Sequence, residues 1–199
     1  MTSQDFKGVV QYYLNLFHQK DCYFEDDQKR IAYFRKNPLN EDASEVLVKI
    51  STMEHKQIDE LFASRQVIAD HIVSLHVDVA LQQGLLQVVD AIAHLETPQR
   101  NYFLYSFATR YCNWHNVTAY PIYDVTTHHL LAFFWRSCQL DTLSDEDFFN
   151  YPRFKECMIT LREAIGMERY TFKEVDKFIW IFGERILQNV VCKRPLVVV

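Results

Sequence analysis

The stretch TFKEVDKFIWIFGERILQNVV, residues 171–191, decides the fold class of this chain. Its apolar residues recur at spacings of three and four positions, which is the period of an α-helix. They surround most of the helix, so we expect it to lie in the centre of the core. The pairing of Thr171 with Glu174 is a capping-box pattern and predicts that the helix begins there. The apolar residues are Val175, Phe178, Ile179, Ile181 and Phe182.

The same helical period runs through the rest of the chain, with almost no strand pattern. Thr97 followed by Pro98 is typical of a helix start, and Gly84 is a candidate break within a helical pattern. A short acidic helix is predicted to open at Thr142 or Ser144. Residues 193–199 are predicted to be a short edge segment or a disordered end. The longer helices are predicted over residues 5–20, 24–37, 40–50, 52–76, 78–96, 98–115, 122–140, 151–167 and 171–191.

These patterns predict an all-α fold of about nine to eleven helices. The length fits one compact domain over residues 1–199, or two packed helical subdomains that divide near residue 96. Only 4 glycines are present, and no two lie close enough together for a glycine-rich phosphate loop. The sequence therefore disfavours both turn-rich β folds and nucleotide binding of the P-loop kind.

The net charge and the cysteine spacing make some functions and locations less expected than others. The formal net charge of −5 lowers the expectation of binding duplex DNA through a broad basic face. The 5 cysteines contain no CxxC pair, which indicates buried thiols in a reducing compartment. There is no signal-peptide pattern and no apolar run of about 18 residues. We predict a cytoplasmic protein with no membrane partner, no cofactor and no metal site.

The stretch RYCNWHNVTAYPIYDVTTHH, residues 110–129, gathers polar and aromatic side chains at the end of an apolar helix. Residues 98–115 form the predicted helix, Tyr120 before Pro121 is predicted to be extended, and Asp124 begins the next helix. Asp124 is predicted to cap that helix. A carboxylate at the lip of a cleft between two helices is the other interpretation, in which Asp124 acts as a base or an electrostatic stabiliser.

Residues 106–134, SFATRYCNWHNVTAYPIYDVTTHHLLAFF, resemble a segment of the helix-hairpin-helix DNA glycosylase superfamily. The resemblance covers about residues 98–134. Ala108 falls on an Ala of the family pattern, and Pro121 and Ile122 lead into Asp124 as the family's turn leads into its catalytic Asp. The family's lyase Lys position is Ser106 here, and RNYFL, residues 100–104, stands where the family has its glycine-containing hairpin.

The resemblance implies a DNA-binding helical protein, either a monofunctional base-excision enzyme or an inactive relative that binds nucleic acid. An active form would hydrolyse an N-glycosidic bond in DNA without lyase activity, with Asp124 as the catalytic carboxylate. A flipped base would be bound by the aromatic and polar groups of the stretch. The substrate-binding residues implied in this way are Tyr111, Trp114, His115, Asn116 and Tyr123.

Two other function classes fit the sequence. The first is a non-catalytic helical module that binds a protein partner or a small ligand through an aromatic cleft. The segment LSDEDFFNYPRF, residues 143–154, mixes acids and aromatics and is a candidate docking segment, and Asp176 and Lys177 are candidates to line the cleft near Asp124. The second is a HEPN-like ribonuclease, because Arg110 and His115 fit that family's R-x4-6-H pattern.

Overall fold

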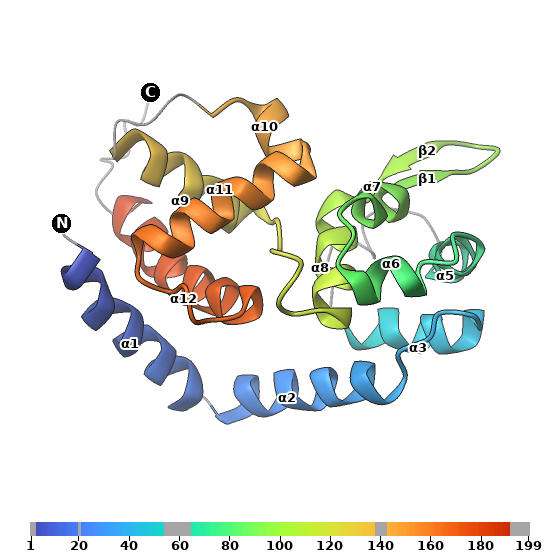
Figure 1. Ribbon diagram of the computed structural model, residues 1–199, viewed down its shortest axis with the longest axis horizontal. Helices are drawn as coiled ribbons and strands as arrows, with labels where there is room; N and C mark the ends of the chain where they lie inside the picture. Colours follow the sequence, from blue (N-terminus) through green and yellow to red (C-terminus); the bar gives the residue numbers. More distant parts are fainter. Residues whose placement is uncertain (1–2, 20, 54–64, 138–142, 192–199) are drawn as a thin grey trace, which may run out of the picture.

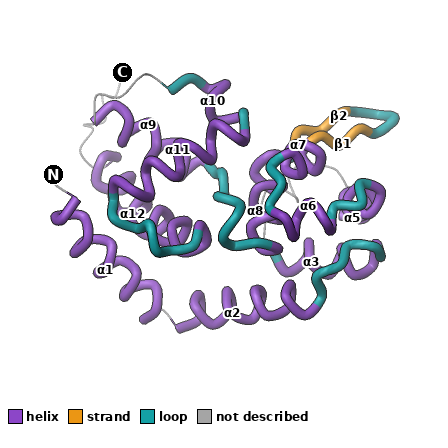
Figure 2. The backbone as a smooth tube through the Cα atoms, viewed as in Figure 1, coloured by secondary structure: helices purple, strands orange, loops and turns teal. Residues whose placement is uncertain are grey.

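The computed structural model describes residues 3–19, 21–53, 65–137 and 143–191. These ranges contain eleven helices and a single pair of short strands, so the predicted all-α class and the predicted helix number are confirmed (Figures 1 and 2). The strands are β1 (His94–Glu96) and β2 (Asn101–Phe103). The helices are α1 (Ser3–Gln19), α2 (Asp21–Lys36), α3 (Ala43–Thr52), α5 (Arg65–Ser74), α6 (Asp78–Gln83), α7 (Gln87–Ala93), α8 (Tyr105–His115), α9 (Val125–Ser137), α10 (Asp145–Phe149), α11 (Tyr151–Ala164) and α12 (Phe172–Val191).

The helices form two neighbouring groups (Figure 1). In one group α12 packs against α1 and α9, and α9 packs on α11. In the other group α8 packs against α7 and α6, and α3 packs against α5. α2 contacts both α1 and α8, so it links the two groups. The prediction that residues 171–191 form a central helix is confirmed, because Val175, Phe178 and Ile179 of α12 are each at most 1% exposed.

A β-hairpin interrupts the region where the sequence predicted two helices in succession. β1 pairs with β2 in antiparallel register, with Leu95 opposite Tyr102. Thr97 and Arg100 exchange backbone hydrogen bonds across the turn, and Pro98 occupies the second turn position, where its fixed φ is favourable. The predicted helix start at Thr97 is therefore wrong, since α8 begins at Tyr105.

The hairpin also changes two smaller predictions. The helix predicted over residues 78–96 ends at Ala93, where β1 follows, and it breaks at Gly84 as expected. Gly84 is the left-handed C-cap of α6 with φ 70°, and a Cβ there would lie 2.9 Å from Ala119 Cβ. Phe103, which falls within the helix predicted over residues 98–115, lies in β2 with 46% of its surface exposed.

Side-chain caps fix several helix starts. Asp42 caps α3 by accepting from the N–H groups of Ser44 and Glu45. Ser144 begins α10 with a capping box, which decides between the two predicted starts. The capping box predicted for α12 is confirmed, because Glu174 accepts from Thr171 N at 2.7 Å and Glu174 N donates to the Thr171 hydroxyl.

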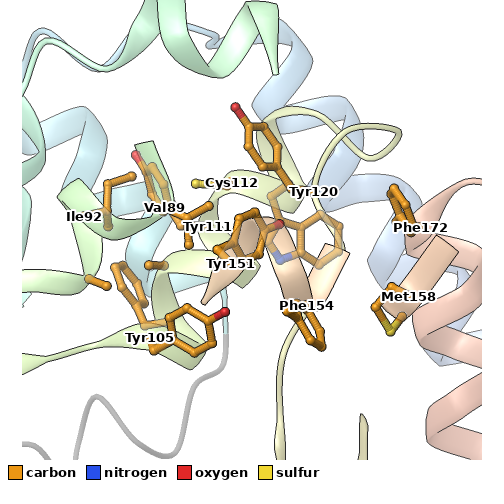
Figure 3. Packing of buried hydrophobic residues seen from close by; sticks show 14 of the residues in the cluster. Val89, Ile92, Tyr105, Tyr111, Cys112, Tyr120, Tyr151, Phe154, Met158 and Phe172 are labelled. Carbon is orange, nitrogen blue, oxygen red and sulfur yellow. The ribbon is translucent and has the colours of Figure 1, made fainter. Parts of the chain in front are cut away.

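A buried polar network joins α8 to the segments around α3 and α6. The Tyr111 hydroxyl donates to Asn40 Oδ1 at 2.6 Å, and Asn40 Nδ2 donates to Asp78 Oδ1 at 2.6 Å. The Lys49 ammonium donates to Asn40 Oδ1 at 2.9 Å and is fully buried. Burial lowers the pKa of Lys49 to about 8, although Asp78 and Glu45 act in the opposite direction. Figure 3 shows the Tyr111 ring among the apolar core residues.

Two predictions lie wholly or partly outside the described residues. Residues 54–64, the first half of the helix predicted over 52–76, are not described, and the second half is α5. The predicted tail over residues 193–199 also lies outside the described ranges. Within those ranges, no helix is both long enough and apolar enough to cross a bilayer.

Candidate functional site

Asp124 lies at the N-terminus of α9, as the sequence predicted. Its Oδ1 accepts from Thr127 N at 2.8 Å, which is the hydrogen bond of a helix cap. Its Oδ2 lies 3.3 Å from Arg110 Nη2, in an ion pair whose side chains are 27% and 23% exposed. Both carboxylate oxygens therefore have protein partners. The arrangement stabilises the start of α9 and ties it to α8.

The two aromatic rings predicted to stack on a base at the end of α8 are core residues. Tyr111 is 0% exposed and Trp114 is 4% exposed. Both pack against Phe34 of α2, with ring centroids 6.0 and 6.1 Å away. The opposite face of Trp114 carries the Lys173 ammonium, 3.9 Å from the ring centroid. Neither ring is accessible to a flipped base in this structure.

His115 and Asn116 also have structural positions. The His115 ring packs against Phe34 and Tyr111, and its Nε2 is shielded from solvent without a hydrogen-bond partner among the described residues. Burial, reinforced by the charge of Lys49, lowers the pKa of His115 to about 3, so this side chain is neutral at pH 7. Asn116 caps the end of α8, and its side-chain oxygen accepts from Ala119 N.

Tyr123 is half-buried beside α10 and α11, away from Trp114. Its hydroxyl pairs with His128 Nδ1 at 3.1 Å, and its ring contacts Phe149 and Phe154. The six predicted site residues thus lie along one segment but do not surround a common cavity. The ribonuclease pair is also divided, because Arg110 is directed to Asp124 while the His115 ring packs on Phe34.

A charged cluster behind Trp114 was not predicted as a site. The Lys173 ammonium lies 3.5 Å from Asp176 Oδ2, and both side chains are almost completely buried. Lys177 pairs with Asp27 of α2 at 2.8 Å, and Arg30 lies 3.6 Å from the same carboxylate. The cluster therefore joins the first two turns of α12 to α2. Asp176 and Lys177, which were predicted as candidates to line the cleft near Asp124, pair with Lys173 and Asp27, and Arg110, the partner of Asp124, also acts on Asp176.

Burial and neighbouring charges shift the ionisation of this cluster. Burial lowers the pKa of Lys173 to about 7, with Asp176 opposing the shift and Lys177 reinforcing it. Burial alone would raise the pKa of Asp176, but Lys173, Lys177 and Arg110 hold it below its ordinary value. Lys173 can therefore gain or lose its proton near neutral pH, which is a property often found at functional sites.

A pocket of about 230 Å³ opens beside the cluster, between α1, α2 and the start of α12. We call it the α1–α2–α12 pocket. Its lining combines apolar side chains with charged side chains from α2 and α12. The lining residues are Leu14, Phe17, His18, Asp27, Gln28, Ile31, Arg35, Val117, Thr171, Lys173, Glu174 and Lys177. This pocket is hard to predict from the sequence, because its charged residues come from α2 and α12, which lie far apart in the chain.

Three cations and two carboxylates line this pocket, and two of the cations, Lys173 and Lys177, are in ion pairs with Asp176 and Asp27. Arg35, Lys173 and Lys177 carry positive groups. The Glu174 carboxylate accepts from the backbone and hydroxyl of Thr171, and Asp27 is held by two cations. The pocket also lies at the N-terminus of the 20-residue helix α12, which is the positive end of the helix dipole.

Metal and thiol chemistry have little support in the described part of the chain. No group of three or more His, Cys, Asp or Glu side chains there is arranged to hold a metal ion. Cys112 is completely buried, and burial raises the pKa of its thiol far above the ordinary value. A buried neutral thiol is a poor nucleophile, so its proximity to His115 has no catalytic consequence.

The fold and the pocket define an all-α protein with a pocket of charged and apolar lining beside α12. Residues 9–120, more than half of the chain, match HI_0787_N, described as an N-terminal domain, and the chain belongs to this family. An uncharacterized protein of Haemophilus influenzae is 30% identical over 129 residues, which cover 62% of this chain and 61% of that protein. The match thus spans less than two thirds of the relative's length. No solved structure matches the chain.

Proposed function

We propose that this protein is a non-catalytic helical module that binds a small anionic ligand with an apolar body in the α1–α2–α12 pocket. The observation that carries the proposal is the set of three cations, Arg35, Lys173 and Lys177, against two carboxylates in the pocket lining. Lys173 and Lys177 are in ion pairs with Asp176 and Asp27, whereas Arg35 makes no ion pair within the described part of the chain. An oxyanion would be attracted to these cations and to the N-terminus of α12. The preferred ligand class is therefore a carboxylate, sulfonate or phosphate ester.

The apolar residues of the pocket indicate that the ligand also has an apolar part. Leu14, Phe17, Ile31 and Val117 line the pocket together with the charged residues. A pocket of about 230 Å³ is smaller than the several hundred Å³ usual for drug-sized ligands. A compact ligand, such as a single aromatic ring or a short aliphatic chain bearing one anionic group, matches this size and polarity.

Base excision stays a prediction, and the geometry favours the binding module over it. Asp124 would have to leave both Arg110 and the N–H groups of α9 before it could act on a sugar. Tyr111 and Trp114 would have to leave the core to stack on a base. Residues 101–103, which stand where the glycosylase family has its glycine-containing hairpin, form the strand β2. DNA binding is the alternative to this proposal, and a DNA titration beside the ligand titration tests it.

The test is a calorimetric titration of benzenesulfonate, whose charge stays fixed over the useful pH range, with benzyl alcohol as the neutral control. We expect benzenesulfonate to bind and benzyl alcohol to bind more weakly. Arg35→Gln should weaken benzenesulfonate binding by about two- to five-fold, the value of one partly exposed charge interaction. The matched control is Lys36→Gln, which removes the same charge from the neighbouring exposed position of α2 without altering the pocket lining.

The proposal fails if benzenesulfonate does not bind, or if Arg35→Gln and Lys36→Gln weaken its binding equally. A parallel salt series with duplex DNA containing an abasic site tests the alternative. Tight, salt-dependent binding to that duplex, with no binding of benzenesulfonate, would instead support a nucleic-acid function. An Asp124→Asn variant would then show whether cleavage, as distinct from binding, depends on this carboxylate.

A further inference from the structure

A second hollow lies on a different part of the surface, between α7 and β1 on one side and α10 with the start of α11 on the other. Its volume is about 550 Å³. The lining residues are Asp90, His94, Glu146, Phe149, Asn150 and Pro152. We call it the α10 hollow. The lining contains two carboxylates and neither Lys nor Arg, so its charge is opposite to that of the α1–α2–α12 pocket.

The two carboxylates of the hollow are not neutralised by neighbouring cations. Within the described part of the chain, no ion pair involves Asp90 or Glu146. Asp90 is partly buried, and burial raises its pKa although His94 opposes the shift. The cost of placing an unpaired carboxylate in this position would be offset by a cation from outside the molecule.

Aromatic rings extend the hollow into a patch. Phe149 is 44% exposed and Phe103 is 46% exposed, and their ring centroids lie 5.9 Å apart. His94 lies 4.9 Å from Phe103, which makes the patch continuous from β1 to α10. Exposed aromatics that cluster beside unpaired carboxylates can bind both the apolar and the cationic parts of a partner.

The patch is held in place by the residue that precedes Phe149. Phe148 is buried, stacks on His128 at a centroid distance of 4.0 Å, and accepts a hydrogen bond from the Tyr105 hydroxyl through its carbonyl. The Ser144 capping box fixes the start of the same short helix. Phe149 is therefore presented from an anchored backbone, which lowers the entropy cost of binding a partner.

We propose that the α10 hollow is a docking site for a partner protein's peptide segment in which arginine or lysine residues flank an apolar side chain. The cationic side chains would pair with Asp90 and Glu146, and the apolar side chain would lie against Phe149 and Phe103. The negative charge of the hollow excludes an acidic segment or a nucleic-acid backbone by repulsion. This proposal is independent of the ligand proposed for the α1–α2–α12 pocket.

The test uses the full-length protein and a fluorescein-labelled peptide, GRRLRG, followed by fluorescence anisotropy. The matched peptide GEELEG should not bind. Glu146→Gln should weaken binding of GRRLRG by about two- to five-fold, and Phe149→Ala by about two- to ten-fold. The side chain of Glu146 is exposed and caps nothing, so its replacement should leave the circular dichroism spectrum unchanged. The control Glu168→Gln removes an exposed carboxylate outside the hollow and should bind GRRLRG as the wild type does.

Three results would overturn the proposal: no binding of GRRLRG, equal binding of GEELEG, or equal effects of Glu146→Gln and Glu168→Gln. Competition by free arginine as effective as that by unlabelled GRRLRG would also overturn it, because the hollow would then be a site for a small cation and not for a peptide.

Discussion

Tyr111 illustrates how single polar residues hold this fold together. Its ring is completely buried, and its hydroxyl supplies the hydrogen bond that connects α8 to Asn40 and through it to Asp78. A buried acceptor that loses its donor has no water to replace it. The network therefore makes the packing of α8 dependent on residues some 70 positions earlier in the chain, since the Tyr111–Asn40 bond spans 71 positions.

Replacing Tyr111 by Phe should destabilise the protein by about 0.5–1.5 kcal/mol, because Asn40 Oδ1 loses its shortest hydrogen bond inside the core and keeps the one from Lys49. The measurement is the free energy of unfolding from urea denaturation. Tyr12→Phe is the control, since Tyr12 is 52% exposed, and it should change that free energy by less than about 0.5 kcal/mol. Equal values for the two variants would show that the Tyr111 hydroxyl does not stabilise the fold.

The lowered pKa of His115 predicts how the free energy of unfolding varies with pH. Its pKa is lowered from 6.5 to about 3 in the folded protein, so between these pH values the unfolded chain binds a proton that the folded protein does not. The contribution of His115 to stability is therefore fully present above pH 6.5 and is lost as the pH falls, by up to about 1.4 kcal/mol per pH unit.

His115→Gln should make the free energy of unfolding less dependent on pH in this window than it is in the wild type. Urea denaturation at several pH values measures the difference. His129→Gln, which changes an exposed histidine of α9, should leave the wild-type dependence in place. An unchanged slope in His115→Gln would mean that His115 is accessible to protons in the folded protein.

Among the helices, α12 and α9 approach each other closely at Gly183. A Cβ built on Gly183 would lie 2.6 Å from Thr126 Cγ2, which is closer than packed side chains approach. Gly183→Ala should therefore separate the two helices and destabilise the protein by about 1–3 kcal/mol. Thermal denaturation monitored by circular dichroism measures this change.

Gly8→Ala is the matched helical control. A Cβ at Gly8 meets nothing within 4 Å, and alanine is the better helix former. This variant should be neutral or more stable by up to about 1 kcal/mol. A Gly183→Ala variant as stable as Gly8→Ala would contradict the close packing of α12 against α9.

The sequence predicted elements well where a long period or a cap specified them. The spacing of Val175, Phe178 and Ile179 identified the central helix, and Thr171 with Glu174 identified its start. The β-hairpin was missed because strands of three residues are too short to show alternation, and Thr97-Pro98 suits a turn as well as a helix start. Local pattern could not distinguish these two uses of Pro98.

The candidate site was less predictable than the fold. The position of Asp124 at a helix N-terminus follows from its place after Pro121, but the pairing with Arg110 depends on how α8 and α9 pack. Polar aromatic residues such as Tyr111 and Trp114 look the same in a sequence whether they line a pocket or fill the core. Lys173 was missed because only the tertiary structure places it on Trp114, beside α2.

At the scale of the whole molecule, the α1–α2–α12 pocket combines two parts of the chain. The pocket residues of α1 and α2, together with Val117, lie within the segment that matches the HI_0787_N family, whereas α12 lies beyond it. A ligand in the pocket would therefore contact both parts and stabilise their association. The α10 hollow likewise combines residues of α7 and β1 with residues of α10 and α11. Each proposed site therefore forms only when helices from distant parts of the chain pack together.

Ligand binding should depend on pH because Lys173, with a pKa of about 7, lines the pocket. A bound anion favours the charged ammonium, so affinity for benzenesulfonate should be highest below that pKa and fall as the pH rises through it. Calorimetry one pH unit below and one above the pKa should show a several-fold loss, with proton uptake on binding at the higher pH. Constant affinity and no proton uptake would mean that the bound anion does not interact with the Lys173 ammonium.

A crystal structure with a bound ligand would show directly whether an anion with an apolar body occupies the α1–α2–α12 pocket. A crystal of the protein with 4-bromobenzenesulfonate would mark the ring by the anomalous scattering of its bromine. We expect a bromine peak against Phe17 and Ile31, with the sulfonate directed toward Lys173, Lys177 and Arg35. Bromine peaks only at other surfaces, or none at a ligand concentration that saturates binding in solution, would contradict it.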